Sequence, residues 1–425
     1  MPQQQPTPRA LGIVEFVALT AVLTALDALS IDTMLPALST MGADLGVAGR
    51  NDTQLVVGML FLGTAFGQVV AGPASDSLGR KRALYGAIVV YLLGSVVCLL
   101  SANFTQMLVG RFVQGFGAAG PVVVVTALIR DLYEGRAMAR IMSFSLAVFI
   151  LVPVMAPLLG QGILLVAHWR FIFLLFLVLA LIVLVWFSLR QPETLPPERR
   201  VPFSVAGLGR SFRLVLGNKV ALAYGVVQGL SSGAFLGYLS SAQAIFQDEY
   251  AQGTRFPLFF ASFAASIGIA SVLNGRLVQR LGMQRLTAVG LAVVSLAAFA
   301  MLPLALATEG QPPLPLVAAW LAVTLFCYGI LFGNIGALQM EHLGEAAGVG
   351  ASVLGSLGLF LAVPIGAVVG QAYDHSIVPL ALGFASMNAL ALSVMAWAER
   401  TRALEEHQTA ADMGVPEAGP DSPMV

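Results

Sequence analysis

The stretch FIFLLFLVLALIVLVWFSL, residues 171–189, decides the fold class of this chain. Its nineteen residues include no charged side chain, and their number is close to the roughly 20 that an α-helix needs to cross the hydrocarbon core of a membrane. An apolar run of this length is too long for the buried strand or short core helix of an ordinary soluble domain. We therefore expect a transmembrane helix here.

The composition of the whole chain is typical of a protein that crosses the membrane many times. Of its 425 residues, 58% are hydrophobic and only 10% are charged, whereas soluble domains carry about 25% charged residues. The 22 basic and 22 acidic residues balance, which leaves no electrostatic footprint for binding nucleic acid. Two cysteines and four histidines are scattered along the chain, so we expect neither a disulfide framework nor a metal site.

Twelve segments are long and apolar enough to be transmembrane helices. They fall into two groups of six, separated by a segment that is rich in proline and arginine. The predicted spans are residues 12–37, 52–75, 83–102, 105–129, 141–166, 170–189, 220–247, 256–278, 286–307, 314–340, 348–373 and 377–398.

This division predicts four parts of the chain. Residues 1–189 form an N-terminal six-helix bundle, and residues 220–402 form a C-terminal six-helix bundle. Residues 190–219 are the cytoplasmic linker between them. The polar residues 403–425 are expected to be a disordered cytoplasmic tail.

The distribution of lysine and arginine predicts the orientation of the spans, because cytoplasmic loops carry an excess of both. With a cytoplasmic N-terminus, 18 of the 22 basic residues lie on the cytoplasmic side. The outer loops hold Arg50, Arg170 and Arg255, and Arg111 lies within a span. We therefore expect both termini in the cytoplasm.

A short motif after the second span recurs after the eighth span, 203 residues further along the chain. The second copy has a glutamine where the first has an acid. Two repeated six-span halves, related by an axis along the membrane normal, are an architecture of secondary transporters. The motif positions are Gly72, Asp76, Gly79 and Arg82 in the first copy, and Gly275, Gln279, Gly282 and Arg285 in the second.

The segment GPASDSLGRKR, residues 72–82, resembles the loop signature of the major facilitator superfamily, G-x-x-x-D-x-x-G-R-[KR]-[KR]. Further segments resemble the twelve-span drug/proton antiporters of its bicyclomycin-resistance (Bcr/CflA) group. The resemblance covers about residues 12–400 and implies the major facilitator fold, an all-α membrane protein with two pseudo-symmetric six-helix bundles. The further segments are LSIDTMLPAL (29–38), GRFVQGFGAA (110–119), ALIRDLY (127–133) and PETLPPERR (192–200).

The resemblance also implies a function. It predicts a proton-driven multidrug efflux antiporter in the bacterial inner membrane, which exports small amphipathic compounds from the cytoplasm by alternating access. The proton gradient drives such a protein, so no cofactor is expected, and its partners are protons, lipophilic or amphipathic drugs and the lipid bilayer around a monomer. The alternative is a proton-linked carrier of one small metabolite, such as an amino acid. An enzyme is disfavoured because no catalytic cluster of acids, histidines or cysteines is evident.

Charged side chains deep in a span cost at least about 2.5–3.5 kcal/mol each, so their positions indicate function. Only Asp27 and Asp32 in the first span and Arg111 in the fourth lie deep, and the second half of the chain has none. On an ideal helix Asp27 and Asp32 point about 140° apart, so one can line the transport path while the other packs between helices. We predict that these three residues couple transport to protons; a structural ion pair is the alternative.

Two motifs are expected to control the conformational change. The resemblance implies that loop 72–82 is a latch that stabilises the outward-open state, although its basic residues would also serve as a simple cytoplasmic anchor. Asp76 is expected to accept hydrogen bonds at a helix start, and Arg80 to pair with an acid. The predicted latch residues are Gly72, Asp76, Gly79, Arg80 and Asp131.

The fifth span contains PVMAPLLGQG, residues 153–162, which resembles the antiporter signature G-x-x-x-G-P-x-x-G-G. The chain departs from that pattern at Ala156 and Gln161. The residues that carry the resemblance are Pro153, Pro157, Gly160 and Gly162.

A polyspecific exporter needs an apolar, aromatic-lined cavity with few polar groups. Aromatic and amide side chains in spans two, four, seven, ten and eleven are candidates for its lining, although each could instead pack between helices or face lipid. Two of them lie three residues apart in span seven and share a helix face. The candidates are Gln114, Phe61, Phe235, Tyr238, Tyr328, Asn334 and Phe360.

Overall fold

The computed structural model describes residues 11–47, 49, 51–133, 135–202, 204–341, 343 and 347–412. Over these residues the chain is helical, with short turns and no β-strand. Eleven helices among them are long and apolar enough to cross a membrane. The twelfth predicted span corresponds to α6, whose described apolar part, Val152–Val166, is shorter than those eleven helices. The prediction of an all-α protein with twelve spans is confirmed.

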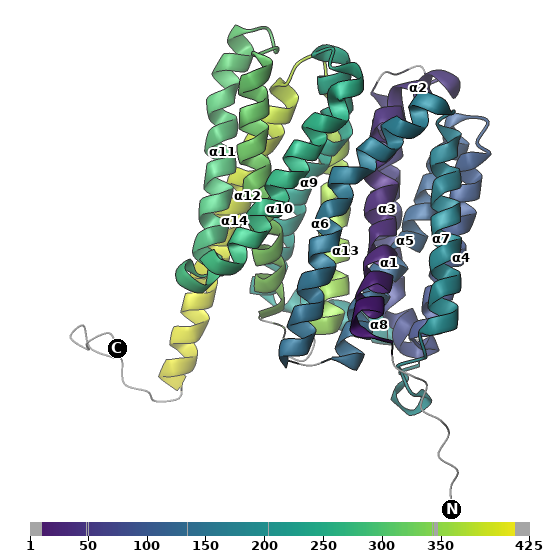
Figure 1. The fold of residues 1–425 in the computed structure, drawn as a ribbon. Coiled ribbons are helices and arrows are strands. Elements are labelled where there is room, and N and C mark those ends of the chain that lie inside the picture. Colours follow the sequence, from purple (N-terminus) through teal and green to yellow (C-terminus); the bar gives the residue numbers. More distant parts are fainter. Residues whose placement is uncertain are drawn as a thin grey trace, which may run out of the picture.

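The helices form two bundles that stand side by side (Figure 1). α1 begins and α14 ends at the same end of the molecule. The first bundle comprises α1 (Ile13–Asp32), α2 (Leu38–Asp44), α3 (Leu55–Leu78), α4 (Arg80–Leu99), α5 (Phe104–Leu132), α6 (Gly135–Val166) and α7 (Arg170–Arg190). α8 (Val205–Gly217) leads to the second bundle, which comprises α9 (Lys219–Gln243), α10 (Phe256–Leu281), α11 (Met283–Ala307), α12 (Leu314–Glu341), α13 (Ala347–Gln371) and α14 (Val378–Asp412).

The bundles meet along two helix pairs, α3 with α13 and α6 with α10. At the end of the molecule where α2 lies (Figure 1), hydrogen bonds reinforce this contact. Asn51 Nδ2 donates to the backbone oxygens of Gln371 at 2.9 Å and Tyr373 at 2.7 Å. Gln243 Nε2 donates to Ser39 Oγ at 3.3 Å. These bonds tie the two bundles together at the end opposite the start of α1.

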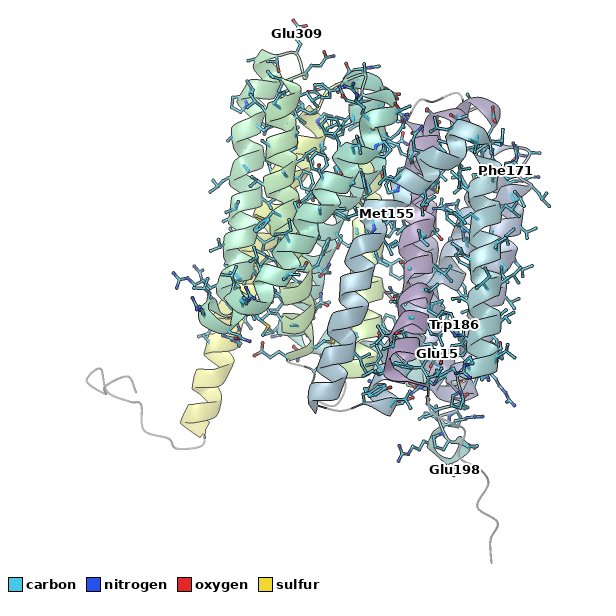
Figure 2. The ribbon with its side chains drawn as sticks, in the orientation of Figure 1. Glu15, Met155, Phe171, Trp186, Glu198 and Glu309 are labelled. Atoms are coloured by element: carbon cyan, nitrogen blue, oxygen red, sulfur yellow. The ribbon has the colours of Figure 1, made fainter. Side chains whose placement is uncertain are left out.

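An ion pair joins the first and last long helices of the first bundle at the other end. Arg190 on α7 donates from Nε and Nη2 to the two carboxylate oxygens of Glu15 on α1, both at 2.7 Å. Trp186 Nε1 donates to the same carboxylate at 3.2 Å, and Figure 2 shows Glu15 and Trp186 beside each other. Glu15 is therefore paired, whereas the two acids deeper in the same helix have no ion pair with a described residue.

The first predicted span, residues 12–37, is interrupted in the structure. α1 ends at Asp32, and a 3-10 turn at Leu35–Ala37 precedes α2. Pro36 lies in this turn, where a ring nitrogen without a hydrogen cannot continue the α-helical bonding pattern. The break places Asp32 at the last residue of α1.

Two segments outside the bundles are more helical than we expected. The linker at 190–219 contains α8, and α14 continues to Asp412, ten residues past the predicted boundary at 402. The extension of α14 contains three alanines and two glutamates, which are strong helix formers. Residues 413–425 of the predicted tail lie outside the described part of the chain.

The repeat found in the sequence is also visible in the backbone. Gly79 separates α3 from α4 with φ +95° and ψ 156°, and Gly282 separates α10 from α11 with φ +76° and ψ 156°. This region of backbone conformation is essentially restricted to glycine. The two halves therefore make the same turn between their second and third transmembrane helices, which are α3 and α4 in the first half and α10 and α11 in the second.

Candidate functional site

Arg111 on α5 lies in the centre of the first bundle and is fully buried. Its Nη1 donates to Gln114 Oε1 at 2.7 Å, and its Nη2 donates to the backbone oxygen of Ser30 at 2.9 Å. Its Nε donates to the backbone oxygen of Val56 at 3.2 Å. Gln114 Nε2 donates in turn to Ser95 Oγ at 2.9 Å. All these acceptors are neutral. Hydrogen bonds therefore hold the guanidinium in place, but no described residue neutralises its charge in an ion pair.

Hydroxyl groups on α1 and α4 complete this network. Ser30 Oγ and Tyr91 OH are 2.7 Å apart, and Ser30 also donates to the backbone oxygen of Leu26 at 2.6 Å. Ser95 lies one turn after Tyr91 on α4, so both face the same side of that helix. Ser30, Tyr91 and Ser95 were not predicted as site residues, because their only signal in the sequence is a polar group within an apolar span.

Asp27 and Asp32 on α1 are close to this network but have no hydrogen-bond or ion-pair partner among the described residues. Asp27 is half-buried, its Oδ1 is enclosed without a hydrogen bond, and Asp32 is 6% exposed. Neither carboxylate forms a hydrogen bond or an ion pair with the described residues. Electrostatic interactions connect Arg111 to Asp27, Asp27 to Asp32, and Asp32 to Tyr238 on α9. This series of polar groups reaches from the first bundle to the second.

The antiporter-like segment of α6 packs directly against the end of α1. A Cβ atom on Gly160 would lie 1.8 Å from the backbone oxygen of Thr33, so only glycine allows this approach. The Thr33 hydroxyl oxygen and Gln161 Oε1 are buried without hydrogen-bond partners. Of the other motif residues, Pro157 is buried, Pro153 is half-buried, and Gly162 has open space beside it.

The second bundle places a neutral aromatic cluster opposite these groups. Tyr328 on α12 is fully buried, and its OH donates to the backbone oxygen of Ser231 at 2.8 Å. Asn388 Nδ2 donates to Tyr328 OH at 3.2 Å. The Phe235 ring centroid lies 6.0 Å from that of Tyr238 and 5.5 Å from that of Tyr328. Three of the predicted cavity residues therefore lie together.

The remaining predicted cavity residues occupy separate places. Asn334 is paired with Asn274 through two amide hydrogen bonds of 2.8 and 3.0 Å. Phe360 on α13 meets Phe66 on α3 with ring centroids 4.8 Å apart, so it lies at the contact between bundles. Phe61 is half-buried against the main hydrophobic core. Gln114, as described above, is enclosed within the first bundle.

Arg80 is the centre of the predicted latch. Its Nε donates to Asp131 Oδ2 at 2.9 Å, and its Nη1 donates to Asp76 Oδ1 at 2.5 Å and Ser75 Oγ at 3.0 Å. The guanidinium thus joins the end of α3, the start of α4 and the end of α5. Gly72, one turn before Asp76, lies against α13 of the second bundle.

The start of α4 is capped by an acid that the sequence analysis did not select. Glu193, just after α7, accepts hydrogen bonds from the backbone N–H groups of Arg80 at 2.9 Å and Lys81 at 3.1 Å. We expected Asp76 to cap a helix start, and this was wrong, because Asp76 lies in the last turns of α3 and binds the Arg80 side chain. The negative charge of Glu193 suits the positive end of the helix dipole.

Two six-helix bundles around buried polar groups define a membrane transport protein of the secondary-transporter class. The family model of the Major Facilitator Superfamily matches residues 20–367 of the chain. Because this match covers most of its length, the chain belongs to the Major Facilitator Superfamily.

Individual relatives agree with this assignment. The chain is 29% identical over 359 residues to the "Uncharacterized MFS-type transporter YdgK" of Bacillus subtilis, covering 83% of this chain and 87% of the relative. It is 29% identical over 374 residues to the "Bicyclomycin resistance protein homolog" of Haemophilus influenzae, covering 86% and 91%. The resemblance to that group is confirmed, and so is the predicted location in the bacterial inner membrane.

Solved structures confirm the fold. A D-xylose–proton symporter superposes with a TM-score of 0.71 at 15% identity, over 90% of this chain and 96% of the symporter. The human organic anion transporter MFSD10 superposes with a TM-score of 0.66 at 18% identity, over 93% and 100%. The prediction of the major facilitator fold is therefore confirmed.

Proposed function

We propose that this protein is a proton-driven antiporter that exports small amphipathic compounds from the cytoplasm. The observation that carries the proposal is the pair of acids on α1: Asp32 is 6% exposed, Asp27 Oδ1 is enclosed, and neither carboxylate has an ion pair or hydrogen bond with a described residue. A carboxylate removed from water is costly unless it is paired or protonated. Asp27 and Asp32 are therefore suited to take up protons in one conformation and release them in another.

Arg111 supports this role as a fixed positive charge. Its three hydrogen bonds to neutral acceptors hold it on the first bundle, within electrostatic range of Asp27. A small movement of α1 relative to α5 would change this interaction and with it the proton affinity of the carboxyl group. Protonation and binding of a cationic or amphipathic drug then compete at Asp27 or Asp32.

The aromatic cluster of the second bundle supports the drug-binding part of the proposal. Phe235, Tyr238 and Tyr328 bring large apolar ring faces together with few polar atoms. Tyr238 interacts electrostatically with Asp32, so a compound bound there would be close to the acid of the first bundle. The bicyclomycin-resistance and MdtL multidrug-resistance names of relatives support the same class of substrate.

The network around Arg80 acts as a conformational latch in this proposal. Its bonds to Asp76 and Asp131 keep the inner ends of α3, α4 and α5 together as one rigid unit. Gly72 brings that unit against α13. Alternating access requires this contact to open and close as the two bundles rock.

The test uses everted membrane vesicles that contain the protein and are acidified inside by respiration. Adding a lipophilic cation such as tetraphenylphosphonium should release protons from the wild-type vesicles. Asp27→Asn and Asp32→Asn should each weaken this release, and the double variant should abolish it. Glu15→Gln is the matched control, because it neutralises an acid on the same helix that is already paired with Arg190.

The proposal is wrong if the double variant still releases protons when the drug is added. If wild-type vesicles respond to a single polar metabolite and to no lipophilic drug, the protein is instead the proton-linked metabolite carrier considered above. Comparable expression of each variant in the membrane is checked by immunoblotting.

A further inference from the structure

A groove on the outer surface of the first bundle is separate from the groups described above. It lies between α3 and α4, with α5 as its floor, and its volume is about 170 Å³. Small residues leave this space open, among them Ala71 and Ala74 on α3 and Gly86 on α4. A Cβ atom on Gly86 would meet no other atom within 4 Å. The groove opens outward, because Val70 and Leu78 on its rim are 38% and 51% exposed.

The length of the groove matches one leaflet of a membrane. On α3 it runs from Gly67 to Leu78, and the eleven steps between these residues span about 16 Å along the helix axis. The hydrocarbon core of a bilayer is about 30 Å thick, so each leaflet contributes about half of that. Leu78 is the last residue of α3, at the end of the molecule where α1 begins. The groove therefore extends from the membrane surface to about the middle of the bilayer.

A free positive charge lies at the surface end of the groove. Arg82 lines it and is exposed, and it forms no hydrogen bond or ion pair with the described part of the chain. Its two basic neighbours are occupied, since Arg80 binds Asp131 and Lys81 Nζ donates to the backbone oxygen of Ser188 at 2.9 Å. The remainder of the groove is apolar. This combination is complementary to an anionic head group attached to an acyl chain.

The second bundle offers an internal comparison, because its residues follow those of the first at an offset of 203. Arg285 occupies the position of Arg82, but larger side chains stand where the first bundle leaves space. Leu286 is 7% exposed and packs in a cluster with Ile330 and Leu277. The equivalent pairs are Ala74 and Leu277, Ala83 and Leu286, and Gly86 and Val289. In the second half, Leu277 and Leu286 therefore pack in the place where the first half has the smaller Ala74 and Ala83.

We propose that this groove binds an anionic phospholipid, with one acyl chain between α3 and α4 and the phosphate at Arg82. Cytoplasmic leaflets carry anionic lipids, and basic pockets between helices on that side are suited to their head groups. The site is independent of the proposed transport path, because its opening faces the membrane rather than the second bundle. The lipid would stabilise the arrangement of α3 and α4 next to the Arg80 network.

The test is native mass spectrometry of the purified, detergent-washed protein, titrated with phosphatidylglycerol or phosphatidylcholine. The wild type should bind phosphatidylglycerol about fivefold more tightly, the contribution expected of one arginine beside an anionic lipid. Arg82→Gln should remove this preference, and Arg82→Lys should keep it. Gly86→Leu fills the groove and should weaken binding of both lipids at least about tenfold, because each methylene lost from the groove costs about fourfold.

Arg285→Gln is the matched control, since it removes the equivalent arginine from the half that has the larger side chains in this place. The proposal is overturned if Arg82→Gln affects phosphatidylglycerol no more than Arg285→Gln does, or if Gly86→Leu leaves lipid binding unchanged. It is also overturned if tetraphenylphosphonium displaces phosphatidylglycerol from the wild type, because the groove would then be a drug site. Size-exclusion chromatography confirms that each variant is folded before the titration.

Discussion

The centres of the two bundles differ in charge although their helices are arranged alike. In the first bundle Arg111 is fully buried close to two acids that form no hydrogen bond within the described part of the chain. In the second, Tyr328 and Asn388 bond to each other and are neutral. Burying a charge is far more costly than burying a hydrogen-bonded hydroxyl or amide. The difference indicates that the first bundle does the work that requires charge and that the second provides a neutral wall.

The two bundles also differ in the turns that follow their second transmembrane helices, α3 and α10. Gly79 and Gly282 adopt the same backbone turn. Arg80 joins three helices in the first half, whereas the position equivalent to Arg80 in the second half is Met283, and the position equivalent to Asp76 is Gln279. The repeat has kept the turn in both halves but has kept a charged network in only one.

Replacing Arg111 is the most severe test of this asymmetry. Arg111→Gln should reduce drug-driven proton release more than about 100-fold, because it leaves several buried acceptors without donors at about 1–3 kcal/mol each. Tyr328→Phe in the second bundle removes one neutral hydroxyl and should cost less than about fivefold. Proton release from everted vesicles measures both.

Arg111→Lys separates charge from hydrogen bonding in the same assay. A lysine keeps the charge but cannot reproduce the fixed fork of donors, so this variant should lie between the wild type and Arg111→Gln. If Tyr328→Phe is as damaging as Arg111→Gln, the two centres are equally important and the asymmetry has no functional meaning.

The second test compares the two loops. Arg80→Gln should lower drug efflux about tenfold, because charge-assisted hydrogen bonds of this kind contribute about 1.5–3 kcal/mol. Arg285→Gln should change efflux less than twofold, as expected for an exposed residue without partners. The measurement is the efflux of a fluorescent cationic drug from intact cells.

A double-mutant cycle shows whether Arg80 and Asp131 act as a pair. If they do, Asp131→Asn should have an effect similar to that of Arg80→Gln, and the double variant should be little worse than either. Additive losses would mean that the contact in the structure has no energetic coupling.

Much of the fold could be predicted from hydropathy because membrane spans must be long and apolar. The deep charges could be found in the same way, because Asp27, Asp32 and Arg111 are charged residues within otherwise apolar spans. Hydropathy does not specify which way a side chain points around its helix, and this limited the cavity predictions. Gln114 is enclosed by Arg111 and Ser95, and only the packing of α4 on α5 reveals this.

Contacts between distant segments explain what the sequence analysis missed. Ser30 and Tyr91 are ordinary polar residues in apolar spans until α1 and α4 bring them within 2.7 Å. Glu193 lies in a segment that resembles the family, but its role as a helix cap depends on how the chain returns from α7 to the start of α4. Such roles follow from tertiary structure and leave no periodic pattern.

The third test concerns the two turns themselves. A side chain in the backbone region of Gly79 and Gly282 costs about 1–3 kcal/mol. A Cβ atom on Gly79 would also lie 2.6 Å from Glu193 Oε2, whereas on Gly282 the nearest atom is 3.8 Å away. Gly79→Ala should therefore lower the melting temperature of the purified protein more than Gly282→Ala. Equal losses would mean that the linker does not constrain the first turn.

The smallest expected effect comes from the linker acid. Glu193→Gln keeps one acceptor oxygen for the start of α4 and removes only the charge beside the helix dipole, a change of about 0.3–1 kcal/mol. Glu193→Ala removes the cap altogether and should cost about 0.5–2 kcal/mol. At the start of α11 the N-cap residue is Gly282, which has no side chain to accept a hydrogen bond. Both variants should therefore still transport, with small decreases in melting temperature.

A different outcome would place the Glu193 carboxylate in the latch itself. If Glu193→Gln lowers efflux as much as Arg80→Gln, the charged network of the first half extends into the linker.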